Sequence, residues 1–268
     1  VGSEMCIRDR NIHVPEFDYN ALSETDKYIY DHYTVPYNVE VVYRWNQGDV
    51  SSDDMRKNLV PPRESQVEPF LEMIEKVWVD TYTAEVGQQT LRSYIPKQIL
   101  LVGSASYNDD GSTTEGTAEG GRQIVLYSVN DFNFTLEQIQ SYAHVMHHEF
   151  AHILHQNVEY DAEFEKITPS YSSSWMQMND ETARTKGFIT AYASSSADED
   201  FAEMVSIMLT NSPEDWDNMI ESAGNATAVE ALRKKEAIVV AYMKNNWGVD
   251  MKDFQKEVVA AIEAAVRN

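Results

Sequence analysis

The chain has 268 residues and a formal net charge of −23, because 44 acidic side chains outnumber 21 basic ones. Its hydrophobic fraction of 43% and aromatic fraction of 11% are those of a globular protein and exclude a disordered chain. The negative charge argues against nucleic acid and anionic membrane surfaces as partners, since both would be repelled. The length suits one sizeable domain or two small ones fused around a cleft.

Cys6 is the only cysteine, which leaves no internal disulfide and no cysteine-based metal site. Residues 1–10 resemble translated adapter sequence, and we expect them to be a non-native head in place of the natural N-terminus. The rest divides into an N-terminal α+β part, residues 11–135, and a mainly helical catalytic part, residues 136–268. We expect the two parts to form one catalytic unit.

Short helices and strands are predicted for the N-terminal part. The spacing of apolar residues predicts helices over residues 26–32 and 64–86, and strands over 38–45, 98–102 and 123–129. Polar connections are expected over residues 47–62 and 103–121. By fold-level analogy, the strand over 123–129 is a candidate edge strand that pairs with an extended peptide.

The second part is predicted to be helical. Thr135 followed by Gln138 is a capping box, so a helix should begin at Leu136. Three more helices are expected near the end of the chain, over residues 213–223, 226–246 and 250–267. The predicted fold class is therefore α+β, with a small mixed or antiparallel sheet and a helical C-terminal part.

The helix that begins at Leu136 has two faces of different chemistry. Six apolar side chains between Ile139 and Leu154 fall on one side when successive residues are placed about 100° apart. Four histidines fall on the opposite side, namely His144, His148, His152 and His155. Lysine, glutamate or glutamine would serve a solvated face, so the stacked histidines indicate a further role.

The segment from His148 to His152, His-Glu-Phe-Ala-His, predicts a zinc site. Histidines four residues apart lie one helical turn apart, so both imidazoles can reach one Zn²⁺ at about 2.1 Å. Glu149 lies beside the first ligand and can take a proton from water bound there. Glu149 is therefore the predicted catalytic base.

The two outer histidines of this face are not expected to bind the metal. His155 lies roughly 10 Å from His148 along the helix axis, too far to share one ion. A pair of His144 with His148 would have no adjacent base, because Val145 follows His144. His144 and His155 are predicted to support the ligands or to line the cleft.

A catalytic zinc requires a third protein ligand and one open position. The residue ten positions after His148 is Val158, and no histidine follows His155, so the third ligand must be a carboxylate. Glu199 and Glu203 lie four residues apart on one helical face. One can bind zinc while the other hydrogen-bonds a ligand imidazole or another polar group, and the two can exchange these roles without a change of motif.

Residues 199–203, Glu-Asp-Phe-Ala-Glu, resemble the third-ligand helix of gluzincin peptidases. The resemblance implies that Glu199 is the zinc ligand and that Glu203 supports the ligands. A similar arrangement places a tyrosine seven residues before the ligand, which here is Tyr192. Tyr192 would then donate a hydrogen bond to the developing oxyanion, although an aromatic packing role is the alternative.

Longer stretches resemble the zinc-binding metallopeptidase lipoproteins of Bacteroidetes, which are associated with outer-membrane nutrient-import loci. The matching stretches are residues 35–45, 116–126, 147–156 and 199–204. The resemblance implies a zincin-like fold, Zn²⁺ as cofactor and a peptide or protein substrate. It also implies an extracytoplasmic outer-membrane lipoprotein that associates with nutrient-import proteins, with its lipid anchor lost with the natural N-terminus. Cys6 lies in no lipobox and is not that anchor.

The predicted function is zinc-dependent hydrolysis of peptide bonds with Glu149 as general base. One alternative is a zinc-containing surface binding protein of a nutrient-import system, against which an intact Glu149 argues. The other is a zinc hydrolase of a non-peptide amide, which nothing in the sequence separates from a peptidase.

Overall fold

The computed structural model describes residues 17–46, 57–107, 113–114, 116–119 and 122–266. The predicted head, residues 1–10, lies outside the described residues, as do residues 47–56 of the first predicted connection. Within the described part of the chain, no helix is long and apolar enough to span a membrane.

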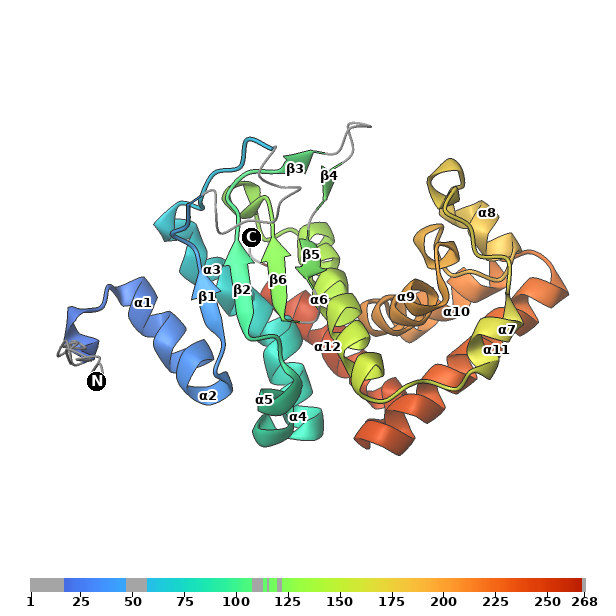
Figure 1. Ribbon diagram of the computed structural model, residues 1–268. Helices are drawn as coiled ribbons and strands as arrows, with labels where there is room; N and C mark the ends of the chain where they lie inside the picture. Colours follow the sequence, from blue (N-terminus) through green and yellow to red (C-terminus); the bar gives the residue numbers. More distant parts are fainter. Residues whose placement is uncertain (1–16, 47–56, 108–112, 115, 120–121, 267–268) are drawn as a thin grey trace, which may run out of the picture.

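A four-stranded mixed sheet forms the centre of the N-terminal part (Figure 1). Its strands lie in the order β1 (Glu40–Val42), β2 (Gln98–Leu101), β6 (Gln123–Leu126) and β5 (Gly116–Glu119). β1, β2 and β6 are parallel, and β5 is antiparallel to β6. A separate antiparallel pair joins β3 (Ser106–Tyr107) to β4 (Thr113–Thr114).

The prediction that residues 123–129 form an edge strand is wrong. β6 lies between β2 and β5, so its backbone is paired on both sides, and among the described strands β5 holds this edge. β5 was not predicted, because Gly-Thr-Ala-Glu has no alternation of apolar residues and falls in the predicted connection 103–121. A side chain on Gly116 would overlap Val145, so glycine lets β5 approach the catalytic helix closely.

The two faces of the sheet pack against different partners. Ile99, Leu101, Ile124 and Leu126 point into the main core with the helices. The residues that alternate with them point to the other face, where they form a smaller cluster with Trp45 and Leu59: Leu100, Val102, Val125 and Tyr127.

The N-terminal helices agree with the prediction and extend it. Residues 24–37 are helical from end to end, with the bounds α1 (Glu24–Ile29), η2 (Tyr30–Thr34) and α2 (Val35–Tyr37). Residues 64–86 also form one helical stretch, composed of α3 (Glu64–Ile74), η5 (Glu75–Val79) and α4 (Asp80–Val86). Shorter elements complete this part: η1 (Tyr19–Ala21), α5 (Gln88–Tyr94) and η6 (Val129–Asp131).

α6 (Leu136–Asn157) lies between the sheet and the helical part of the molecule (Figure 1). It begins at Leu136 as predicted, because the Thr135 hydroxyl accepts a hydrogen bond from the Gln138 backbone N–H. Its predicted apolar face is buried in the main core, from Ile139 to Leu154. The opposite face packs against α9 (Ala197–Thr210).

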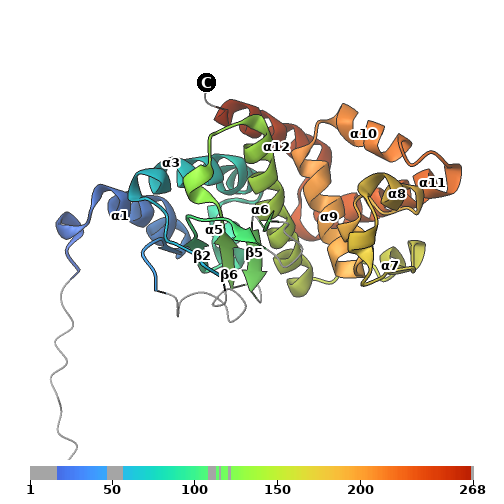
Figure 2. The same cartoon turned by 90° about the horizontal axis from the view of Figure 1, so that it is seen from above.

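The C-terminal part is made of helices, as expected (Figure 2). The three predicted C-terminal helices are α10 (Pro213–Glu221), α11 (Ala226–Tyr242) with η9 (Met243–Trp247), and α12 (Met251–Ala265). Between α6 and α9 lie four shorter elements, α7 (Glu163–Ile167), η7 (Trp175–Gln177), α8 (Asp180–Thr185) and η8 (Tyr192–Ser194).

Candidate metal centre

α6 and α9 bring three of the predicted ligand atoms together. His148 Nε2 and His152 Nε2 lie 3.1 Å apart, one turn apart on α6. Glu199 Oε2, from the first turn of α9, lies 3.0 Å from His148 Nε2 and 3.1 Å from His152 Nε2. Ligand atoms of a tetrahedral zinc site lie roughly 3.4 Å apart, so this separation is close to that of a zinc site.

The contacts of the two Nδ1 atoms suit a cation at the point where the three ligand atoms meet. His152 Nδ1 lies 2.9 Å from His155 Nε2, and His148 Nδ1 lies 2.9 Å from Glu203 Oε1, which is off the line of the N–H bond. A proton on each Nδ1 leaves a lone pair on each Nε2. These lone pairs and the Glu199 carboxylate then face one another, which is favourable only with a cation between them. The donor set of two imidazoles and one carboxylate fits zinc.

The charges around His148 favour a positive charge in the same place. Burial lowers the pKa of His148, but the hydrogen bond with Glu199 and the nearby negative charge of Glu203 outweigh it and raise the pKa to about 10. Burial would raise the pKa of Glu199, yet its hydrogen bonds with His148 and His152 hold that pKa well below its usual value. The cluster therefore stabilises a cation, whether proton or metal ion.

Glu203 lies behind the ligand atoms. Its side chain is 4% exposed, against 24% for Glu199, and its Oε1 lies 3.2 Å from His144 Nε2. Its Oε2 accepts a hydrogen bond of 2.6 Å from the Thr190 hydroxyl. Glu203 thus contacts the far side of His148 rather than the point where the three ligand atoms meet, although with His144 and His148 it forms a second group of metal-binding type.

His144 and His155 lie where the sequence placed them, on the histidine face but away from the convergence point. His155 contacts His152 through its ring nitrogen, and its ring packs against Tyr160 and Phe201. Their supporting roles stay predictions. His147, the fifth histidine of α6, is fully buried, and burial lowers its pKa to about 3.

Glu149 and Tyr192 flank the cluster. Glu149 is half-buried next to His148, and burial, with the nearby charge of Glu199, raises its pKa. Tyr192 is 37% exposed, and its ring centroid lies 5.8 Å from that of His148. Burial, the charge of Glu199 and a hydrogen bond with Glu199 raise the pKa of the Tyr192 hydroxyl, so at neutral pH it keeps its proton and can donate it in a hydrogen bond.

Sequence reasoning missed several residues that position these groups. Ser196 accepts a hydrogen bond from the Glu199 backbone N–H and begins α9, a cap that the Ser-x-x-Glu spacing could have revealed. The Thr190 hydroxyl also accepts a hydrogen bond from the Ala193 backbone N–H, so it links η8 to Glu203. Trp175 packs edge-on against Tyr192 with ring centroids 4.9 Å apart, and no local pattern predicts that contact.

Comparison with known proteins agrees with this geometry. A family described as "Putative zinc-binding metallo-peptidase" matches residues 19–252, which is most of the chain. The chain belongs to this family. Zinc is therefore its cofactor, and the residues that converge between α6 and α9 are of the type that holds it.

A solved structure supports the same assignment. The crystal structure of a putative zinc-binding metallo-peptidase from Bacteroides caccae ATCC 43185 is 33% identical in sequence and superposes with a TM-score of 0.78. The match covers 91% of this chain and 95% of that one. The α+β metallopeptidase fold predicted from the sequence is confirmed, with its small mixed sheet and helical C-terminal part. No curated protein matches the chain.

Proposed function

We propose that this metallopeptidase hydrolyses peptide bonds with Glu149 as general base. The observation that carries the proposal is the convergence of His148 Nε2, His152 Nε2 and Glu199 Oε2 within 3.1 Å of one another. Glu149 stands next to the first of these residues on the same helix. A purely structural metal site would have no use for an acid beside its ligands.

Each residue has one task in the proposed reaction. His148, His152 and Glu199 would hold the zinc, which would supply a Lewis acid for the scissile carbonyl and the attacking water. Glu149 takes a proton from the attacking water and passes it to the leaving amine nitrogen. Tyr192 donates a hydrogen bond to the carbonyl oxygen as negative charge develops on it. Glu203 and His155 hold the imidazoles of His148 and His152 in their orientations.

The test is peptide cleavage and zinc content measured on the same samples. Glu149→Gln should retain one zinc per chain and lose roughly 10²–10⁴-fold in kcat on a casein-type substrate, because it removes the proton acceptor. The matched control is Glu181→Gln, which changes an exposed carboxylate on α8. Zinc in all three proteins without cleavage by the wild type would point to the binding-protein alternative. Equal cleavage by Glu149→Gln would eliminate the base assignment.

Tyr192→Phe tests the oxyanion donor separately. It keeps the ring that packs on Trp175 and removes the hydroxyl, which also hydrogen-bonds Glu199, so kcat is measured on zinc-saturated samples. We expect kcat to fall about 100-fold with little change in KM, because the hydrogen bond strengthens in the transition state. An unchanged kcat would assign Tyr192 to packing.

The resemblance to lipoproteins of nutrient-import loci supports a further part of the proposal. We place the natural protein outside the cytoplasm, anchored to the outer membrane by lipid, where it would act on peptides or proteins beside nutrient-import proteins. Fractionation of cells that express the natural gene tests this. Recovery of the protein in the cytoplasmic fraction would contradict it.

A further inference from the structure

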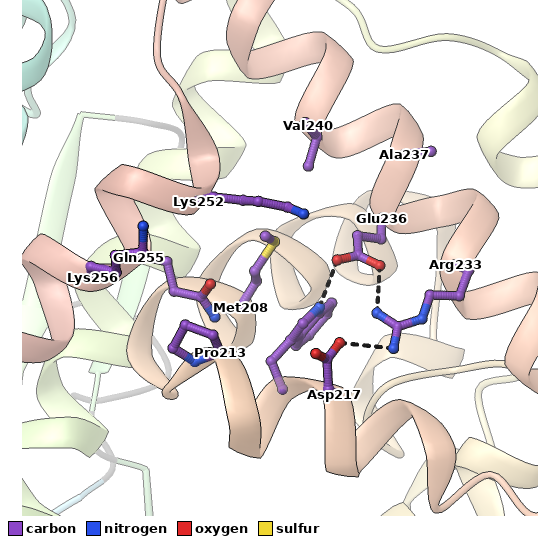
Figure 3. A pocket seen from close by; sticks show the side chains of 11 residues that line it. Met208, Pro213, Asp217, Arg233, Glu236, Ala237, Val240, Lys252, Gln255 and Lys256 are labelled. Atoms are coloured by element: carbon purple, nitrogen blue, oxygen red, sulfur yellow. Dashed lines mark hydrogen bonds and ion pairs between the residues drawn. The ribbon is translucent and has the colours of Figure 1, made fainter.

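A cavity lies among the C-terminal helices, away from the metal centre (Figure 3). Its volume is about 400 Å³, within the range of roughly 300–1,000 Å³ found for small-molecule sites. Met208, at the C-terminal end of α9, lines it. Met208 is nine residues beyond Glu199, or about 14 Å along the helix axis, so this cavity and the metal centre are distinct sites.

The cavity has an apolar base and a charged rim. Pro213 and Trp216 of α10, Val240 of α11 and Met208 provide the apolar surface. The charged lining residues are three cations, Lys252, Lys256 and Arg233, and two anions, Asp217 and Glu236. Three minus two gives a local charge of +1 in a chain whose net charge is −23.

Most of the charged groups already have partners. Arg233 donates hydrogen bonds to Glu236 at 2.9 Å and forms an ion pair with Asp217 at 2.8 Å. The indole N–H of Trp216 donates to the other oxygen of Glu236. Lys256 pairs with Asp253 at 3.0 Å. The charged groups on this side of the cavity therefore already pair with one another or with neighbours and do not require a ligand.

Two groups of α12 remain available to a ligand. Among the described residues, none lies within ion-pair distance of the Lys252 ammonium, which reaches over the cavity in Figure 3. Gln255 is only 2% exposed, and its amide N–H donates to the Asn211 carbonyl at 3.0 Å. Its own carbonyl oxygen accepts no hydrogen bond from the described residues and lines the same cavity. Because Gln255 is held in place by its bond to Asn211, this oxygen is positioned to accept a hydrogen bond from a ligand that brings a donor.

We propose that this cavity binds a small peptide-like carboxylate with an apolar side chain, such as an acylated amino acid. The carboxylate would pair with Lys252, the amide N–H would donate to Gln255, and the side chain would lie against Met208, Pro213 and Val240. A carboxylate without an amide cannot make the contact with Gln255, and a neutral amide cannot make the ion pair with Lys252. The site is independent of peptide hydrolysis.

The test is calorimetric titration of the zinc-loaded full chain with N-acetyl-L-phenylalanine. We expect a Kd between about 0.1 and 5 mM, since one free cation in an acidic protein gives modest affinity. N-acetyl-L-phenylalaninamide, which lacks the charge, should bind at least tenfold more weakly, and so should hexanoate, which lacks the amide. Equal binding of either analogue would overturn the proposed chemistry, as would no binding of the acid up to 20 mM.

Two variants locate the binding. Lys252→Gln should weaken it at least tenfold, whereas Lys234→Gln should not, because Lys234 pairs with Glu230 outside the cavity. Both lysines are exposed, so neither change should affect folding. Removal of zinc should leave the affinity of the wild type unchanged. Binding that is lost with zinc, or that Lys252→Gln leaves intact, would assign the carboxylate elsewhere and overturn the proposal.

Discussion

α6 and α9 both present proposed ligands to the candidate metal centre, but different interactions fix their positions. In α6 the two imidazoles are spaced by the helix itself, and the apolar face behind them fills the main core. α9 provides one carboxylate, and buried polar contacts with distant segments help to hold it. Lys235 of α11 pairs with Asp200, which also accepts a hydrogen bond from Tyr171 at 3.0 Å.

The proposed ligands on α6 and on α9 therefore depend on different parts of the structure. A ligand pair on one helix is set by local geometry and tolerates changes elsewhere in the fold. Glu199 reaches the same point only if α9 keeps its place against α6, and that place depends on residues far away in sequence. For a given loss of stability, mutations around α9 should therefore lower zinc affinity more than mutations in the core of α6.

The largest effect should distinguish the two carboxylates of α9. Glu199→Ala removes a ligand atom, so zinc affinity should fall by more than the roughly 100-fold upper limit for a supporting residue. Glu203→Gln keeps the size of a buried side chain that contacts His148 and His144. Zinc affinity should therefore fall only about 10–100-fold in this variant. Competition with a chromophoric chelator measures both. The reverse order would make Glu203 the ligand.

The next effect should fall on stability. Lys235 and Asp200 are both fully buried, and the Lys235 ammonium also donates to the Gly187 carbonyl at 2.8 Å. Lys235→Met leaves the Asp200 carboxylate buried without its partner and should cost about 3–5 kcal/mol in the free energy of unfolding. Denaturant titration of the zinc-free protein checks this.

Lys234→Met is the matched control for that measurement. Its side chain is 60% exposed, so the change should stay within about 0.5 kcal/mol. If Lys235→Met is equally mild, the buried pair does not hold α9. If the double variant Lys235→Met/Asp200→Leu regains stability, the unpaired charge was the cause of the loss.

The smallest effect should come from the cap of α9. Ser196→Ala removes the hydroxyl that accepts the Glu199 backbone N–H, which should cost about 1 kcal/mol. Because the first turn of α9 carries the ligand, zinc affinity should also fall slightly, by less than tenfold. Ser195→Ala, one residue earlier, is the control. Equal losses of stability and zinc affinity in Ser196→Ala and Ser195→Ala would show that the cap has no special role.

The sequence predicted α6 in detail because its signals are local. The capping box, the apolar face and the two histidines one turn apart all fall within 22 residues, and each needs only helical periodicity. For α9 the same periodicity placed Glu199 and Glu203 on one face but could not rank them. In the structure Glu199 Oε2 lies near both Nε2 atoms, whereas Glu203 lies against Nδ1 of His148, which favours Glu199 as the proposed ligand.

The error in the sheet has a similar cause. The apolar run Gln-Ile-Val-Leu predicts a strand at residues 123–126, but strand order depends on pairing with segments elsewhere in the chain. β5 was hidden because its residues carry no apolar alternation, and it forms by pairing with β6. Contacts such as Trp175 with Tyr192 are likewise set by tertiary structure alone.

The most direct test of the central claim is an anomalous diffraction measurement at the zinc edge on crystals grown with zinc. We expect a single strong peak between α6 and α9, at about 2.1 Å from His148 Nε2, His152 Nε2 and Glu199 Oε2. A peak held by His144 and Glu203 instead, or no peak between the two helices, would contradict it.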